Sequence, residues 1–275
     1  MEINNSCKRA IDMQRVINAR HLGGFVTSDG RKTRDGLLLR TGHLAEASDE
    51  DIKALAETYH VTKIFDLRTS MEVNENKDRP VPGAEPFHVS IIDTNGIIGM
   101  NMSRIYNCPG NSKNERLLNF IMSESAKMLT DGFYISFVDD EYSQSKFTFI
   151  LKEIVNTPDG AVLWHCSEGK DRTGLVAIFI LTALGVDKES VLQDFDRSNV
   201  AYEPIINEIS RQVIERGGDE EALAITKGLF GVSRRWMEDA WDFIDRHFGS
   251  MDSYIRDVLM LTEEDIAVLK DRYLE

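Results

Sequence analysis

The segment between residues 161 and 185 constrains the fold of this chain more than any other part of it. Residues 161–164 are all apolar and follow the turn sequence Pro158-Asp159-Gly160, which predicts a short, fully buried strand. A polar loop comes next, and the helix predicted from about Gly174 is apolar on every side until Gly185 ends it. A strand and a helix of this kind belong at the centre of an α/β fold.

The rest of the chain fits this interpretation. Ser48 and Asp51 have the spacing of a capping box before a helix, residues 63–67 form a strand-like run, and residues 87–91 alternate as in a half-buried strand. Further helical spacing recurs at 52–59, 147–154, 205–213 and 237–248, and from Thr262 onward. We predict a single α/β domain over residues 1–275, with a central, mostly parallel sheet flanked by helices and a helical C-terminal region.

Residues 96–130 interrupt the regular pattern. They combine glycines with short apolar pieces, and their helical spacing is only suggestive. We predict a lid-like insertion here.

Composition limits the partners that the chain can have. It has 32 Lys and Arg against 46 Asp and Glu, a formal net charge of −14, which disfavours nucleic acid and anionic membranes. No apolar run approaches the roughly 20 residues of a membrane span, and the first residues lack the apolar core of a secretory signal. We therefore expect a soluble, cytoplasmic protein without stable membrane insertion. The three cysteines, Cys7, Cys108 and Cys166, are too few for a disulfide scaffold.

The loop between the predicted strand and helix reads His165-Cys-Ser-Glu-Gly-Lys-Asp-Arg-Thr-Gly174. A loop that runs into a helix N-terminus presents unpaired backbone N–H groups and the positive end of the helix dipole to one point, where an anion can bind. Cys166 lies at the start of this loop, and the same field favours its thiolate, which is a nucleophile. Cys7 and Cys108 have no such setting, and we expect them to be bystanders.

Arg172 follows Cys166 after five intervening residues, so the loop can curl around a tetrahedral group whose oxygens the guanidinium grips. Gly169 would allow a positive φ where the loop turns inward, and Thr173 could place its hydroxyl near the sulfur. This arrangement predicts attack of Cys166 on phosphorus, with Arg172 as a catalytic phosphate ligand. The predicted substrate-binding residues are Ser167, Glu168, Gly169, Lys170 and Thr173.

A zinc site at this loop is disfavoured, because His165 and Cys166 are adjacent and no second cysteine pair exists. No metal or cofactor is expected, since Arg172, the backbone amides and the helix dipole supply positive charge.

The run His-Cys-x₅-Arg-Thr resembles the signature of the cysteine-dependent protein tyrosine phosphatase superfamily. Residues 169–174, with the segments 18–24, 40–44 and 66–68, are similar to a bacterial tyrosine and lipid phosphatase family that has mycobacterial members. The resemblance covers most of the chain and implies a phosphatase fold and phosphoester hydrolysis through a phosphocysteine intermediate. His21 departs from the pattern, because that family usually carries Asp at this position.

Such hydrolysis needs an acid that protonates the leaving oxygen and a base that later activates water. Asp171 lies inside the loop, and in the resembled family a loop Asp has this kind of role. Asp93 is the alternative, because dual-specificity and related lipid phosphatases carry a mobile acid after the corresponding strand, although Asp93 also fits a turn cap. We favour Asp171. Supporting roles fall to His165, Asp66 and Arg68, and the last two could simply pair with each other or brace the loop.

The leading hypothesis is a metal-independent protein tyrosine phosphatase, with dual specificity as an extension. Lys170 adds positive charge beside the loop, which resembles phosphoinositide phosphatases and keeps a lipid head group open as substrate. Inorganic phosphate would be the product. A non-catalytic phosphate-binding pseudophosphatase is a further alternative, but Cys166 and Arg172 are both present. Arsenate reductases and low-molecular-weight phosphatases carry such a loop near the N-terminus, which disfavours them here.

Overall fold

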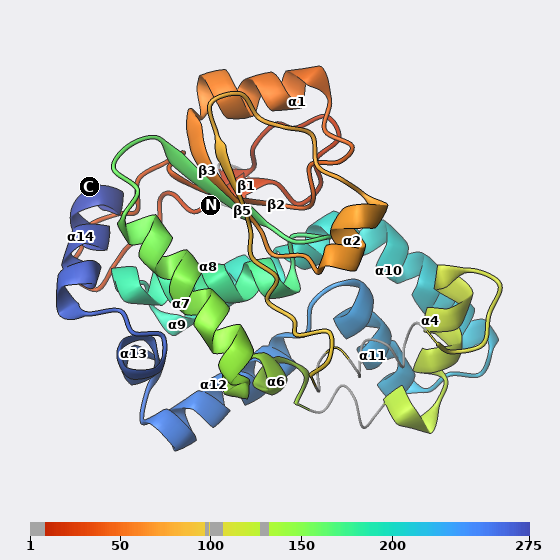
Figure 1. The fold of residues 1–275 in the computed structure, drawn as a ribbon. Helices are drawn as coiled ribbons and strands as arrows, with labels where there is room; N and C mark the ends of the chain where they lie inside the picture. The colour runs from red at the N-terminus through yellow and green to blue at the C-terminus, as the bar shows by residue number, and fades with distance from the viewer. Residues whose placement is uncertain (1–8, 97–98, 100–106, 127–131) are drawn as a thin grey trace, which may run out of the picture. The chain divides into compact units, whose positions relative to one another are not determined.

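The computed structural model describes residues 9–96, 99, 107–126 and 132–275 (Figure 1). The chain divides into two compact units that interleave along the sequence. The first unit comprises the described residues of Met1–Ile91, Ser145–Asp194 and Asp252–Glu275, and the second comprises those of Ile92–Gln144 and Phe195–Met251. The prediction of a single domain stays a prediction.

The first unit contains a five-stranded sheet in the order β1-β2-β5-β3-β4. β1 pairs antiparallel with β2, and the other three pairings are parallel, which confirms the predicted mostly parallel sheet. The strands are β1 (Arg20–His21), β2 (Leu38–Thr41), β3 (Val61–Asp66), β4 (Glu85–His88) and β5 (Ala161–His165). All of β5 is buried, as its apolar sequence predicts. It lies between β2 and β3, so the chain leaves the middle of the sheet when it enters the loop at Cys166.

Helices cover both faces of this sheet (Figure 1). On one face, Leu39 and Leu163 pack in one core with Leu55. On the other, the indole of Trp164 donates to the carbonyl of Thr173 at 3.0 Å, and Phe87 contacts Phe149. The helical elements of the chain around this sheet are α1 (Asp49–Lys53), η2 (Ala54–Thr58), α2 (Ser70–Glu75), α7 (Glu141–Val155), α8 (Asp171–Leu184), α9 (Lys188–Asp196), α13 (Met251–Ser253), η3 (Tyr254–Val258) and α14 (Glu263–Tyr273).

Two expectations for this part of the chain need correction. The helix predicted over 52–59 has α geometry only to Lys53 and continues as the π-helical turn η2. The strand predicted over 87–91 lies earlier in the chain, because β4 ends at His88 and its own side chains are mostly exposed. Val89 and Ile91, just beyond it, are buried as the alternation predicts. The chain still runs beside β3, because the N–H groups of Val89 and Ile91 donate to Asp66 and Leu67 at 2.8 and 3.4 Å. The acceptors lie at the last residue of β3 and just beyond it, so these two bonds do not extend the regular pairing of β3 with β4.

The other helix features that the sequence predicts around the sheet are confirmed. The capping box joins Ser48 and Asp51 as expected. The apolar helix α8 is buried along nearly its whole length, although it begins at Asp171 and not near Gly174. Gly185 ends it with a φ of 91°, a conformation that glycine adopts at little cost.

The second unit is helical where it is described. Its longer helices are α4 (Lys113–Ile121), α6 (Phe133–Asp139), α10 (Ser198–Glu215), α11 (Glu220–Phe230) and α12 (Arg234–Phe248). Leu118 and Ile121 of α4 share a core with Ile209, Val213 and Ile225. This confirms the helical C-terminal region. About a third of the predicted lid at 96–130 lies outside the described residues, and α4 forms part of the rest, so the lid stays a prediction.

None of the helices in the described part of the chain combines the length and the apolarity that a membrane crossing requires.

Candidate active site

The predicted nucleophile lies where β5 ends and α8 begins. Only 2% of the Cys166 surface is exposed, and Arg172, in the first turn of α8, is 8% exposed. Cys166 and Cys108 are both free thiols, whereas Cys7 lies outside the described residues. Cys166 and Arg172 therefore form a buried nucleophile and a buried cation at the two ends of one short loop. We call residues 166–172, which include the first two residues of α8, the Cys166 loop.

The turn of the Cys166 loop depends on Gly169. Its φ is 66°, as its position predicts, which favours glycine. A Cβ at this position would lie 2.2 Å from the carbonyl oxygen of Thr41. The loop thus passes against the end of β2 at a distance that only a residue without a side chain allows.

Arg172 is held by a residue that the sequence reasoning missed. Its two terminal nitrogens donate to the two carboxylate oxygens of Glu72 on α2, each at 2.8 Å, and the hydroxyl of Ser167 donates to Glu72 at 2.5 Å. Glu72 also closes a capping box with Thr69, which is the one sequence signal that could have indicated it. Glu72 therefore links the start of the Cys166 loop with the arginine at its end.

The environment of Glu72 and Arg172 keeps both side chains charged. Burial would raise the pKa of Glu72, but hydrogen bonding and charge from Arg172 outweigh it and hold the pKa well below its usual range. Burial would lower the pKa of Arg172, but its interactions with Cys166 and Glu72 outweigh burial and raise it. Both side chains are therefore ionised over the whole physiological range.

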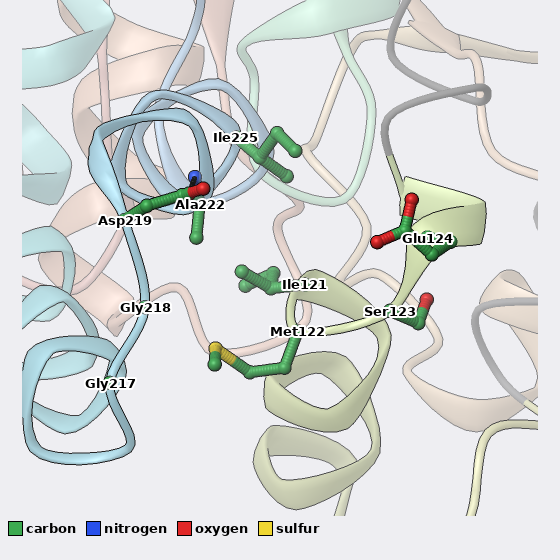
Figure 2. Close-up of a pocket in the computed structure, with 9 residues that line it drawn as sticks. All are labelled: Ile121, Met122, Ser123, Glu124, Gly217, Gly218, Asp219, Ala222 and Ile225. Carbon is green, nitrogen blue, oxygen red and sulfur yellow. Dashed lines mark hydrogen bonds between the residues drawn. The ribbon is translucent and has the colours of Figure 1, made fainter.

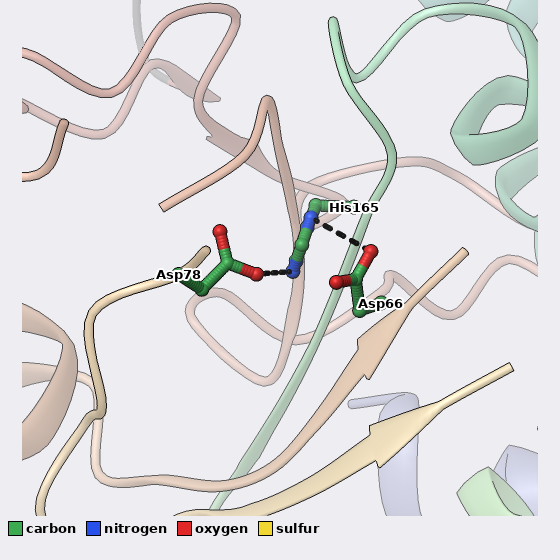
Figure 3. A group of neighbouring side chains, drawn as sticks. All are labelled: Asp66, Asp78 and His165. Carbon is green, nitrogen blue, oxygen red and sulfur yellow. Dashed lines mark ion pairs between the residues drawn. The ribbon is translucent and has the colours of Figure 1, made fainter. Parts of the chain in front are cut away.

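The supporting residues form one network behind the loop. Arg68 donates to Asp66 at 2.8 and 2.7 Å and to Asp78 at 2.7 Å, so the predicted pairing of Asp66 with Arg68 is present. Figure 3 shows the His165 ring between the two carboxylates, with its Nε2 3.1 Å from Asp78. Burial would raise the pKa of Asp78, but the adjacent His165 ring and the charge of Arg68 outweigh it and lower the pKa. Sequence reasoning did not identify Asp78.

Asp66, Asp78 and His165 offer three ligand atoms within 4.8 Å of one another, so a metal ion has to be considered. The guanidinium of Arg68 already bonds both carboxylates at hydrogen-bonding distance. A cation placed among them would be repelled by Arg68. The donor set therefore fits a histidine, carboxylate and arginine network better than a metal centre.

Lys170 is tied to its neighbours in the loop. Its side chain is buried, and its ammonium lies 3.3 Å from Glu168 and 3.7 Å from Asp171. Burial would lower the pKa of Lys170, but Asp171 and Glu168 outweigh it and raise the pKa. The hydroxyl of Thr173 is buried and has no hydrogen-bond partner among the described residues, so its predicted role toward the sulfur stays a prediction.

The two candidate acids differ in setting. Asp171 is the first residue of α8, in the same unit as Cys166. Asp93 belongs to the second unit, where its carboxylate accepts from the N–H of Asn95 at 2.9 Å and its carbonyl accepts from Gly96 at 3.0 Å. These bonds are those of a turn cap, the alternative interpretation of Asp93.

His21 replaces the acid that the resembled family carries, and its ring takes an acceptor role. Its Nδ1 accepts a hydrogen bond from the N–H of Gly23 at 3.0 Å. A carboxylate at this position could accept the same bond.

One cavity of about 130 Å³ lies in the second unit, between the end of α4 and the start of α11 (Figure 2). Ile121, Met122 and Asp219 are among its lining residues, and none of the predicted site residues lines it. The Cys166 loop, and not this cavity, carries the groups that chemistry on a phosphate requires.

Comparison with known proteins agrees with this geometry. A protein of Cupriavidus necator that bears the name of a tyrosine-protein phosphatase is 28% identical over 265 residues, covering 94% of this chain and 86% of its own. The triple specificity protein phosphatase of Mycobacterium tuberculosis is 28% identical over 243 residues, covering 82% of this chain and 86% of its own. A dual specificity protein phosphatase of Pseudomonas aeruginosa is 33% identical over 94 residues, covering 30% of this chain and 42% of its own.

The sequence profile of the tyrosine phosphatase family matches residues 11–275, which include the sheet, the Cys166 loop and the C-terminal helices. The phosphatase fold and the phosphatase activity that the resemblance implied are thereby confirmed, and this chain belongs to the tyrosine phosphatase family.

Proposed function

We propose that this enzyme hydrolyses phosphotyrosine in proteins through a covalent phosphocysteine on Cys166, and that it also accepts phosphoserine and phosphothreonine. The observation that carries the proposal is the placement of Cys166 and Arg172 at the two ends of a tight loop between β5 and α8. The names of the mycobacterial and pseudomonad relatives support the wider specificity.

In the first step the Cys166 thiolate attacks phosphorus, a sulfur–phosphorus bond forms, and the bond from phosphorus to the tyrosine oxygen breaks. Arg172 and the N-terminus of α8 stabilise the charge on the phosphoryl oxygens. Asp171, protonated at this point, gives its proton to the leaving oxygen. The product of this step is a free tyrosine side chain and a phosphocysteine.

In the second step Asp171, now a carboxylate, removes a proton from water. The water oxygen attacks phosphorus, the sulfur–phosphorus bond breaks, and inorganic phosphate leaves with the thiolate regenerated. Arg172 and the loop amides supply the positive charge for both steps, so the proposal needs no metal ion.

A phosphoinositide is the second candidate substrate, because Lys170 adds a cation to the loop. Lys170 is buried and lies between Glu168 and Asp171, so much of its charge is balanced within the loop. This observation favours a phosphoprotein over a polyanionic lipid head group. A panel of phosphotyrosine, phosphoserine and phosphoinositide substrates at equal concentration would rank them.

The test of the mechanism compares the wild type with Cys166→Ser in the presence of a chelator, using an aryl phosphate as substrate. We expect turnover by the wild type and its loss, by at least about 10³-fold, in the serine variant, because a hydroxyl is a far weaker nucleophile than a thiolate. Thermal unfolding checks that both proteins fold. Activity that survives the substitution would exclude the phosphocysteine, and phosphopeptide binding without turnover by the wild type would indicate a pseudophosphatase.

A further inference from the structure

We infer that Asn18 and Arg40 are positioning residues, which hold the peptide groups of the Cys166 loop so that their N–H groups converge on the phosphate. The inference deepens the function proposed above and rests on it. It assigns a purpose to two of the segments, 18–24 and 40–44, that resemble the family but carry no reacting group.

The loop's first carbonyl groups are held from outside by neighbouring segments. The carbonyl of His165 accepts from the N–H of Leu67 at 2.8 Å. The carbonyl of Ser167 accepts from the N–H of His43 at 3.2 Å, and that of Cys166 lies 3.2 Å from Nδ1 of His165. These partners come from the ends of β2, β3 and β5.

Side chains hold the carbonyl groups in the second half of the loop. The amide of Asn18 donates to Glu168 at 3.3 Å and to Gly169 at 2.8 Å. One terminal nitrogen of Arg40 donates to Gly169 at 3.0 Å and to Lys170 at 3.3 Å. Together with the preceding contacts, every carbonyl from residue 165 to residue 170 has a partner outside the loop or at its start.

Peptide geometry turns this carbonyl pattern into an anion site. In a planar trans peptide the C=O of one residue and the N–H of the next point in opposite directions. Donors that hold the carbonyls of residues 166–170 on the outside therefore direct the N–H groups of residues 167–171 to the inside. A cradle of N–H groups of this kind binds a phosphate or another tetrahedral anion.

The setting of Arg40 fits a role in holding the loop carbonyls, because its side chain does not contact solvent. It is 0% exposed and also donates to Asp194 at 2.9 Å, an acid that Arg20 contacts at 3.0 Å. Burial and repulsion from Arg20 lower the pKa of Arg40 to about 9, so it stays charged at neutral pH. A buried cation is costly unless its hydrogen bonds are satisfied, and the loop carbonyls satisfy part of this one.

Asn18 offers a sharp test because its two amide atoms have separate partners. Its oxygen accepts from Arg20 at 2.5 Å, whereas its nitrogen donates to the loop. Asn18→Asp keeps the acceptor for Arg20 and replaces the donor by an oxygen that repels the loop carbonyls. Asn18→Gly removes both without adding charge and suits the φ of 55° at this position.

The experiment measures alkylation of Cys166 by iodoacetate, an anion that needs the cradle, and by iodoacetamide, which is neutral. In both reactions the thiolate sulfur bonds to carbon and iodide leaves. We expect Asn18→Asp to lower the ratio of the two rates by about tenfold or more, and Asn18→Gly to lower it less, because one misplaced oxyanion donor has effects of at least this size. Arg40→Lys keeps the positive charge but loses the planar guanidinium, and it should also lower the ratio of the two alkylation rates.

Protection by inorganic phosphate provides the second measurement. The concentration of phosphate that halves the iodoacetate rate should rise in the Asn18 variants, while their melting temperatures stay close to that of the wild type. Asn156→Asp is the matched control, since Asn156 is exposed at the end of α7, before β5 begins. It introduces the same charge and should leave both measurements unchanged.

An unchanged ratio in folded Asn18→Asp, or in Asn18→Gly should the first variant not fold, would overturn the inference. Alkylation does not require turnover. If the wild type failed to hydrolyse phosphoesters but the ratio still fell in the variants, the proposed function would fail while the positioning role stood.

Discussion

At the scale of single residues, Glu72 joins the two ends of the Cys166 loop. Its carboxylate accepts hydrogen bonds from both terminal nitrogens of Arg172 and from the hydroxyl of Ser167. Its backbone belongs to the first turn of α2. A guanidinium held by two charged hydrogen bonds keeps one orientation. The orientation of Arg172 toward a phosphate is therefore set by a residue of α2, although Arg172 itself belongs to α8.

Glu72→Gln should lower kcat/KM for an aryl phosphate by about tenfold, because one charged hydrogen bond to Arg172 is lost. Steady-state kinetics measures the effect. Glu75→Gln, an exposed position on the same helix, is the matched control and should behave as the wild type does. Equal kcat/KM in the two variants would show that Arg172 keeps its orientation without Glu72.

The choice of general acid is also decided at the residue scale. Asp171→Asn should reduce kcat by about 10²-fold for a substrate with a poor leaving group, and much less for one with a good leaving group, because only the poor one needs a proton. The pH profile of kcat should lose its basic limb at the same time.

Asp93→Asn is the paired variant, since Asp93 was the alternative acid and now fits a turn cap. It should leave the dependence on leaving group unchanged. If Asp93→Asn and not Asp171→Asn removed that dependence, the roles of the two residues would have to be exchanged.

At the scale of elements, the junction of β5 with α8 decides the shape of the site. Thr41, His165 and Asp66 are in register at the ends of three neighbouring parallel strands. Parallel strands place their carboxyl ends at one edge of the sheet, where α/β folds bind ligands. The loop leaves from the middle of that edge, so segments from both sides can reach its carbonyl groups.

Gly169→Ala tests how tightly this junction is packed. The positive φ and the approach to Thr41 should together cost about 2–4 kcal/mol of unfolding free energy. Urea unfolding measures it. Gly30→Ala is the control for φ alone, because Gly30 has a φ of 84° and nothing within 4 Å of an added Cβ, so it should cost about 1 kcal/mol. Similar losses in both variants would mean that the loop can move away from β2.

At the scale of the whole molecule, carboxylates that are partly or fully buried couple stability to pH. Burial would raise the pKa values of Glu72, Asp78 and Asp51, but hydrogen bonds outweigh it and lower all three, with neighbouring positive charge contributing at Glu72 and Asp78. The unfolded chain therefore binds more protons than the folded one in acid. Their stabilisation is complete above the ordinary carboxyl pKa of about 4 and is lost as the pH falls through the lowered values.

We therefore expect the unfolding free energy, measured in urea, to decrease steadily from pH 5 towards pH 3, at about 1.4 kcal/mol per pH unit for each extra proton that the unfolded chain binds. Glu72→Gln should make this decrease shallower, because one of the carboxylates with a lowered pKa is removed. An acid limb of unchanged slope in that variant would show that Glu72 is not among the groups responsible.

The net charge of −14 acts over the whole molecule, whereas the positive field at the Cys166 loop is local. The global charge repels polyanions, yet Arg172 and Arg40 lie buried at the Cys166 loop, where solvent screens their charge less than at the surface. A count of charges cannot reveal this local field.

Features that depend on neighbours along the chain can be predicted without the structure. The buried strand, the apolar helix, its end at Gly185, the capping box at Ser48 and the positive φ of Gly169 are local properties, and each was predictable. The pair of Cys166 and Arg172 belongs to this class because both lie in one short loop. That is why the family and the chemistry could be predicted before the structure was known.

The residues that surround the Cys166 loop could not be predicted in this way, because folding brings them there from distant parts of the chain. Glu72 is 100 residues from Arg172 in sequence, and Asn18 is 151 residues from Gly169. A hydrogen bond between residues so far apart leaves no spacing pattern, since it forms only when the sheet brings the strand ends to one edge. The sequence therefore specified the reacting groups, while the folded sheet selected the side chains that orient them.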